Sequence, residues 1–216
     1  MNLIPIGFAG RRLDPDGNFL NNNNVGKDTV ADALETITKE MYKHKYMVYR
    51  RNLAYPVKAC CIQKFGIGWR HFDRENKEIK NIKVGDGMYS PRELAQLEGT
   101  DYGRKVYGES IWIDTLINSE KEQLHYDKIY NRIVIIGDIR FENEAQWVRD
   151  KGILIHVSRV DKQEKYSQKT FDNLHPSEMM VSYKPQSDII LDNNGTLEAI
   201  PTLCYQLLMS NIRPIL

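Results

Sequence analysis

The chain has 216 residues, of which 41% are hydrophobic and 27% are charged, with a formal net charge of +1. This length predicts one large domain, or a domain with a small appendage, that buries roughly 70% of its unfolded surface. The balanced charge argues against a general nucleic-acid-binding protein, and no apolar run reaches the roughly 18 residues of a membrane-spanning helix. Cys60, Cys61 and Cys204 lack the spacing of a metal site, so we expect reduced thiols in a cytoplasmic protein.

The N-terminal stretch predicts a phosphate-binding loop. Residues 3–8 form a short apolar run typical of a buried strand, and apolar residues recur at helical spacing over residues 30–41. Between them Gly10 opens a glycine-containing segment that closes with Gly26-Lys27-Asp28-Thr29. In such a P-loop, backbone N–H groups, a helix N-terminus and the lysine ammonium together bind phosphates. A flexible loop that ends in Gly-Lys by chance is the alternative.

This loop departs from the usual P-loop in two ways. Residues 11–25 stand where about four residues are usual, and Asp28 takes the place of the hydroxyl that normally follows the lysine. The inserted residues are polar, with a turn signal at residues 14–17 and four asparagines at 21–24. We expect the insertion to be a solvated excursion in which residues 12–24 stay mobile. A flap that brings Arg11 and Arg12 onto phosphate is the functional alternative.

Strand and helix patterns alternate along the rest of the chain. Residues 133–136 are apolar and β-branched, as in a central parallel strand. Ser90, Pro91 and Glu93 form a helix start with a capping box, and Gly99 and Gly103 suggest close backbone approach in that helix. The other predicted strands are 46–49, 153–157 and 188–191, the other helices are 53–65, 111–124, 142–151 and 197–209, and residues 73–89 and 160–185 read as irregular. This alternation predicts an α/β fold with a mostly parallel five-stranded sheet.

Charged groups follow the predicted strand ends. In such sheets ligands bind at the carboxyl ends of the strands, where Gly10, Asp138, Arg140, Arg159 and Asn193 would gather. Phosphoryl transfer needs converging cations, so Lys27, Arg140 and Arg159 are candidate catalytic residues, and Asp138 is placed to hold Mg²⁺. The alternatives are a salt bridge between Asp138 and Arg140 that caps the sheet, and a solvated loop position for Arg159.

A second set could bind a nucleoside monophosphate. Arg92 and Gln96 lie four residues apart, on one face of the predicted helix, and Arg104 and Trp112 follow. An arginine guanidinium could bind the phosphate, an amide could hydrogen-bond the edge of the base, and an aromatic ring could stack on the face of the base. A core tryptophan with surface arginines is the alternative reading.

Together these stretches resemble the bacteriophage-type deoxynucleoside monophosphate kinases, a group of P-loop kinases. The resemblance covers residues 26–32, 55–58, 91–112, 138–144, 175–178 and 194–196, in the family's order and over nearly the whole chain. Gly-Lys-Asp-Thr is this family's form of the loop. The resemblance implies a single domain, residues 1–216, with the three-layer α/β/α fold of nucleoside monophosphate kinases, a helical monophosphate-binding region at about 52–125 and a lid over ATP at about 159–185.

The resemblance also implies an activity. It implies ATP-dependent phosphorylation of a deoxynucleoside monophosphate to the diphosphate, with Mg²⁺, often in a homodimer, and in the host cytoplasm if a phage encodes the chain. Asp28 and Asp138 would be the metal ligands, and Asn193 would lie near adenine. The implied ATP-binding residues are Gly10, Gly26, Lys27, Asp28, Thr29 and Asn193, and the implied monophosphate-binding residues are Arg92, Gln96, Gly99, Thr100, Arg104 and Trp112.

Two alternatives to this activity remain at the level of sequence. One is a P-loop kinase for another small acceptor, such as dephospho-coenzyme A. The other is a nucleotide-binding module that has lost catalysis, for which the interrupted loop is the only support. Lys27, Asp138 and Arg140 together argue against the second alternative. The accepted bases are not predicted.

Overall fold

The computed structural model describes residues 2–21, 24–127, 131–160, 175–179 and 181–216. The chain forms two compact units. We call Met1–Asn52 with Leu124–Leu216 the sheet unit, and Leu53–Gln123 the helical unit. No helix of the described residues is long and apolar enough to cross a membrane. All three cysteines are free thiols.

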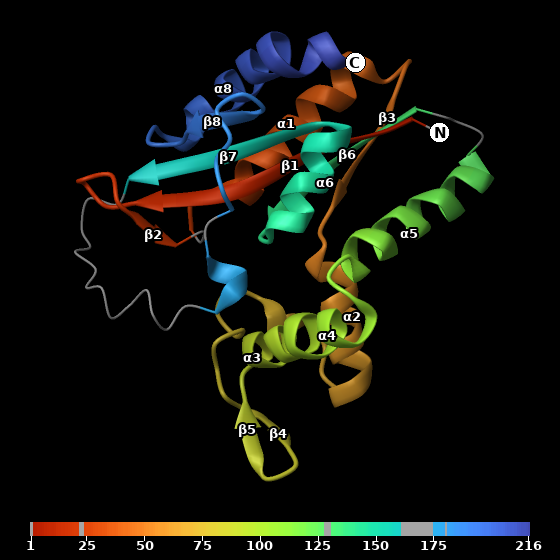
Figure 1. The fold of residues 1–216 in the computed structure, drawn as a ribbon, viewed down its shortest axis with the longest axis vertical. Helices are drawn as coiled ribbons and strands as arrows, with labels where there is room; N and C mark the ends of the chain where they lie inside the picture. The colour runs from red at the N-terminus through yellow and green to blue at the C-terminus, as the bar shows by residue number, and fades with distance from the viewer. Residues whose placement is uncertain (1, 22–23, 128–130, 161–174, 180) are drawn as a thin grey trace. The chain divides into compact units, whose positions relative to one another are not determined.

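Among its described residues the sheet unit has six strands. Five of them are parallel neighbours in the order β3-β6-β1-β7-β8, and β2 pairs antiparallel with β1 (Figure 1). All five predicted strands are confirmed, and the predicted central strand lies in β6, between β3 and β1. The bounds are β1 Asn2–Leu13, β2 Phe19–Asn21, β3 Met47–Arg51, β6 Asn131–Ile139, β7 Ile153–Val160 and β8 Asp188–Asp192.

Helices cover both faces of this sheet. Ile6 and Phe8 point from β1 into a core shared with α1 (Lys27–Tyr42) and α8 (Ile200–Leu207). Gly7, on the opposite face, lies against Val148 of α6 (Glu142–Lys151), where a Cβ on Gly7 would come 2.9 Å from a Val148 methyl. The predicted three-layer α/β/α arrangement is therefore confirmed. The last residues continue α8 as Leu208–Ile212 and Arg213–Ile215, and a short turn of helix, Leu197–Ala199, precedes it.

The inserted segment forms a β-hairpin in its described residues, where a solvated loop was expected. Strand β1 runs through Gly10 to Leu13, and Gly10 pairs with Val157 of β7. The turn is closed by Asp14, whose carboxylate accepts hydrogen bonds from the backbone N–H groups of Asp16 (2.9 Å) and Asn18 (2.8 Å). The local turn signal was correct, but the pairing that extends β1 depends on a strand more than 140 residues away in the chain. Residues 22–23 lie outside the described part.

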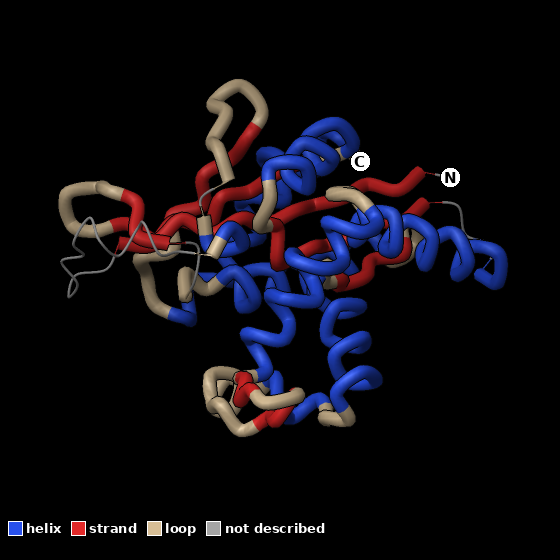
Figure 2. The backbone as a smooth tube through the Cα atoms, turned by 60° about the horizontal axis from the view of Figure 1, so that its bottom comes forward, coloured by secondary structure: helices blue, strands red, loops and turns tan. Residues whose placement is uncertain are grey.

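The helical unit has its own small core. Cys61, Ile82 and Leu94 are buried together there. The predicted capping box is confirmed, because the Ser90 hydroxyl accepts from the Glu93 N–H (3.2 Å) and the Glu93 carboxylate accepts from the Ser90 N–H (2.9 Å). Residues 73–89, which were expected to be irregular, contain a hairpin of two short strands (Figure 2). The elements are α2 Ala54–Phe65, a turn Trp69–Phe72, β4 Ile82–Val84, β5 Gly87–Tyr89, α3 Pro91–Gln96, a π-helix Leu97–Arg104, α4 Lys105–Tyr107 and α5 Ile111–Asp127, which continues into the sheet unit.

A buried ionic network fixes the start of β8. Both carboxylate oxygens of Asp188 accept hydrogen bonds from the Arg149 guanidinium at 2.8 Å, and His156 Nε2 lies 3.0 Å from Asp188 Oδ2. Burial raises the pKa of Asp188, but hydrogen bonds from Arg149, the Lys184 N–H and His156 outweigh it and hold that pKa well below its usual value. Burial lowers the pKa of His156, and Asp188 offsets only part of this.

The network predicts loss of stability in acid. His156 is held neutral in the fold, so its contribution is present above the unfolded pKa of about 6.5 and declines as pH falls below it. Asp188 is held ionised, so its contribution declines as pH falls below about 4. We expect urea unfolding of the wild type to show a falling free energy between pH 7 and pH 4. Asp188→Asn should cost about 3–5 kcal/mol at pH 7, because Arg149 loses a buried partner.

The matched control is Asp150→Asn on the exposed side of α6. Among the described residues, the Asp150 carboxylate accepts a single hydrogen bond, from the Gln146 side chain. It should change the free energy of unfolding by less than about 0.5 kcal/mol. Equal stability of Asp188→Asn and the wild type at pH 7 would contradict the role given to the network.

Candidate active site

The phosphate loop ends in a left-handed turn at Gly26. Gly26 has φ 84°, and α1 begins at the next residue, Lys27. Asn193, which follows β8, donates from its side-chain amide to the Val25 carbonyl (2.8 Å), and a Cβ on Gly26 would overlap that amide. Glycine is therefore required here both for its φ and for its lack of a side chain. The first turn of α1 presents the backbone N–H groups and the positive helix end that bind anions.

Lys27 is the first residue of α1, and the charges of Asp28, Asp138 and Arg140 all act on its pKa. Burial lowers the pKa of Lys27 to about 8, and the positive charge of Arg140 lowers it as well, whereas Asp28 and Asp138 act in the opposite direction. Asp138 lies near the end of β6, and Arg140 directly follows that strand. One further cation and two carboxylates therefore act on Lys27 at the carboxyl edge of the sheet.

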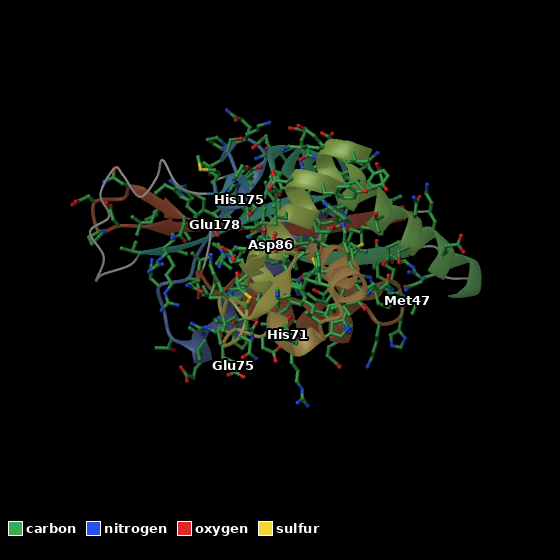
Figure 3. All side chains as sticks on the ribbon, turned by 90° about the horizontal axis from the view of Figure 1, so that it is seen from below. Met47, His71, Glu75, Asp86, His175 and Glu178 are labelled. Carbon is green, nitrogen blue, oxygen red and sulfur yellow. The ribbon has the colours of Figure 1, made fainter. Side chains whose placement is uncertain are left out.

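The position of Arg140 is fixed by two neighbours that the sequence analysis did not assign. The buried Glu144 carboxylate accepts from the backbone N–H groups of Arg140 (2.9 Å) and Phe141 (3.1 Å). Arg140 Nη1 lies 3.4 Å from the Ser177 carbonyl, and His175 Nδ1 lies 2.8 Å from the Ser177 hydroxyl. Ser177 belongs to a single turn of 3-10 helix, Pro176–Glu178, which His175 precedes as its N-cap; His175 and Glu178 are labelled in Figure 3. Arg140 Nε is buried without a hydrogen-bond partner among the described residues. It is the kind of donor that an anionic ligand would satisfy.

Arg50 is a further charged residue at this edge that sequence reasoning missed. It lies in β3 and reaches Asp28 of α1 with a distance of 2.8 Å between Nη2 and Oδ1. No motif marks it. Its proximity to Asp28 depends on β3 lying next to β6 in the sheet, which the strand pattern alone does not reveal.

Two of the predicted positions in the sheet unit differ from expectation. Gly10 lies inside β1 and not at the start of a loop, so the predicted opening of the phosphate loop at Gly10 is wrong. Arg159 lies in β7, exposed, in register with Arg12 of β1. Residues 161–174 and 180 of the predicted lid, 159–185, lie outside the described part of the structure.

The predicted monophosphate-binding residues all lie in the helical unit. Trp112 is 9% exposed, and its indole N–H donates to the Gly99 carbonyl (2.8 Å). Arg92 Nη1 lies 2.6 Å from the Glu78 carboxylate. Trp112 therefore packs as a core residue in this conformation and is not presented as a stacking surface. The predicted residues lie in α3 (Arg92 and Gln96), in the π-helix (Gly99, Thr100 and Arg104) and at the start of α5 (Trp112).

The described residues contain no cluster of three or more histidine, cysteine, aspartate or glutamate side chains that could hold a metal ion. The negative charges of Asp28 and Asp138, the two predicted ligands, both raise the pKa of Lys27. One or two carboxylates suit Mg²⁺ that arrives with a nucleotide, because Mg²⁺ keeps several waters and takes other ligands from the phosphates.

Comparisons with known proteins identify the family. A family model described as deoxynucleotide monophosphate kinase matches residues 62–203. A deoxynucleoside-5'-monophosphate kinase of Escherichia phage T5 is 33% identical over 118 residues, which is 51% of this chain but only 41% of that protein's length. A protein of Acanthamoeba polyphaga mimivirus, provisionally named a deoxynucleotide monophosphate kinase, is 26% identical over 164 residues, 68% of this chain and 76% of its own. Among solved structures, a dephospho-CoA kinase from Campylobacter jejuni aligns over 100% of this chain and 99% of its own, with a TM-score of 0.40 and 12% identity.

The packing of Trp112 predicts a specific effect of Gly103→Ala. A Cβ on Gly103 would come 2.5 Å from Trp112 Cζ2 and 2.8 Å from the Glu98 carbonyl oxygen, so the indole must shift. We expect a loss of about 1–3 kcal/mol in unfolding free energy, the usual range for overpacking, together with a change in tryptophan emission. Gly68→Ala in the same unit is the control, because no atom lies closer than 4.0 Å to its added Cβ. Similar urea unfolding curves for the two variants would show that the indole is not held against Gly103.

Proposed function

Because the chain belongs to the deoxynucleotide monophosphate kinase family, we propose that it transfers the γ-phosphoryl group of ATP to a deoxynucleoside monophosphate. The products are ADP and a deoxynucleoside diphosphate. The observation that carries this proposal is the grouping of Lys27, Asp138 and Arg140 at the N-terminus of α1, beside the left-handed Gly26. Phosphoryl transfer depends mainly on positioning and on neutralising charge, and this grouping supplies both.

The sheet unit binds ATP in this proposal. The N–H groups after Gly26 and the Lys27 ammonium hold the outer phosphates, and Thr29 lies in the same first turn of α1. Arg140 supplies an additional cation to the transferred group, and Arg159 is a second candidate for that role. Asn193 contributes by holding the Val25 carbonyl, which keeps the loop in its turn.

Asp138 is the better placed of the two metal candidates. Its carboxylate acts on Lys27, and Asp28 already forms an ion pair with Arg50. When bound with ATP, Mg²⁺ would supply charge neutralisation to the β- and γ-phosphates. Asp138 would hold it directly or through water.

The helical unit binds the acceptor in this proposal. Arg92, Gln96 and Arg104 supply a guanidinium, an amide and a second guanidinium, with Thr100 between the last two in the sequence. Guanidinium groups match phosphate oxygens in geometry and charge. Trp112 acts by fixing the Gly99 carbonyl and the turn that carries Thr100.

A coupled assay for ADP release tests the proposed function. The purified protein is given ATP and Mg²⁺ with each of the four deoxynucleoside monophosphates, with ribonucleoside monophosphates, and with dephospho-coenzyme A. Turnover that depends on a deoxynucleoside monophosphate supports the proposal. Turnover only with dephospho-coenzyme A, or ATP binding without any turnover, would replace it with one of the two alternatives.

Lys27→Ala should lower kcat about 10²–10³-fold without loss of the fold, because Lys27 neutralises charge that grows in the transition state. In the wild type, kcat/KM for ATP should fall as pH rises through about 8, where Lys27 loses its proton. Lys43→Ala at the far end of α1 is the control. Steady-state rates and circular dichroism are the measurements, and a folded Lys27→Ala protein with near-normal kcat would remove Lys27 from the mechanism.

Asp138→Asn should raise the Mg²⁺ concentration needed for half-maximal activity, because one charged metal ligand is lost. Arg140→Ala should cost roughly 2–5 kcal/mol in kcat/KM, the range for removing one partner of a buried charge contact. Each effect is read from initial rates at several Mg²⁺ and ATP concentrations. If both variants keep wild-type kinetics but unfold at lower temperature, these residues cap the sheet and do not act in transfer.

A further inference from the structure

We propose that Arg50 is a positioning residue for the phosphate site: it compensates the charge of Asp28 and anchors the first turn of α1. This inference rests on the proposed function, because it concerns how ATP is bound. Arg50 lies in β3, outside the phosphate loop, and would act on ATP only through Asp28 and the helix that carries it.

The guanidinium of Arg50 joins three elements of the sheet unit. Nη2 lies 2.8 Å from Asp28 Oδ1, and Nε lies 3.2 Å from Asp32 Oδ1, one turn further along α1. Nη1 donates to the Asn52 side-chain oxygen (3.0 Å) and lies 3.4 Å from the Ile135 carbonyl of β6. Its side chain is only 15% exposed, whereas the Asp28 and Asp32 side chains are 80% and 67% exposed. The arginine is therefore held in place by the sheet, and the helix start is held by the arginine.

The electrostatics of Asp28 give this contact a function. Asp28 follows Lys27 directly and stands where a P-loop usually carries a hydroxyl. A carboxylate at a helix N-terminus is favourable in the empty protein, but it repels a polyphosphate bound at the same place. Asp32 lies one turn further along α1, so the two carboxylates share one cation, Arg50, whose side chain is 15% exposed. Without Arg50 the carboxylates of Asp28 and Asp32 would lose this ion-pair partner and repel bound ATP more strongly.

Gly137 leaves room for this arginine. A Cβ on Gly137 would overlap Arg50 Nη2, and the other nearest atoms also belong to the Arg50 guanidinium. The backbone at Gly137 is not in the left-handed region that favours glycine. Glycine at this position is therefore explained by the guanidinium. Gly137→Ala displaces Arg50 without removing its charge from the protein.

The test measures ATP binding in the absence of acceptor, by titration calorimetry. Arg50→Ala and Gly137→Ala should each weaken ATP binding roughly tenfold, a size typical of one charge contact. The double variant should be no weaker than Arg50→Ala alone, because the guanidinium that the added methyl group displaces is then absent. Asp28→Asn in the Arg50→Ala background should restore most of the affinity, since the uncompensated carboxylate is removed. Lys39→Ala, which removes an exposed cation further along α1, is the control and should change the affinity less than twofold.

Three results would overturn the inference. They are unchanged ATP affinity in Arg50→Ala, unchanged affinity in Gly137→Ala, and failure of Asp28→Asn to restore Arg50→Ala. The last result would mean that Arg50 has a purely structural role. If Arg50→Ala does not fold, Gly137→Ala with and without Asp28→Asn provides the same comparison. A wild-type protein that binds no ATP would instead overturn the proposed function itself.

Discussion

The pairing of β1 with β6 on one side and β7 on the other is the interaction on which the rest of the structure depends. Ile6 is in register with Ile135 of β6 and with Ile153 of β7. Because the three strands are parallel, their carboxyl ends reach the same edge of the sheet. That edge receives Asp138 from β6, Asn193 after β8 and the helix that follows the β1–β2 segment. Lys27 and Arg140, which are more than 110 residues apart, meet for this reason.

Short-range patterns were sufficient to predict much of the fold. The apolar runs located five strands, and the Ser90–Glu93 capping box located the start of α3. These features depend on residues a few positions apart, so they are visible in a single sequence. The hairpin strand β2 was missed because it is only three residues long, lies in an otherwise polar segment, and depends for its formation on the extension of β1 along β7. Gly10 was misplaced for the same reason.

The candidate site was proposed from the Gly-Lys motif for Lys27, and from the position at the end of an apolar strand for Asp138 and Arg140. It was not predictable where a side chain reaches across the sheet. Arg50 carries no motif, and its contact with Asp28 depends on the order of strands β3 and β6. Trp112 shows the opposite difficulty, because an aromatic residue in a substrate-like segment can equally be a packing residue. Its burial and its indole bond to Gly99 distinguish the two, and neither is visible in the sequence.

Strand β1 is longer than its neighbour β6, and this difference in length bears on solubility. The register with β6 ends at Ala9, whereas the register with β7 continues to Leu13. The last residues of β1 would thus present an open edge on the side that β6 leaves, and such edges recruit strands from other molecules. Strand β2 occupies that side, with Arg12 opposite Asn21 and Leu13 opposite Phe19. The inserted segment thereby pairs backbone groups of β1 that β6 leaves open, and the edge that remains belongs to a strand of three residues, a length that offers little to an incoming strand.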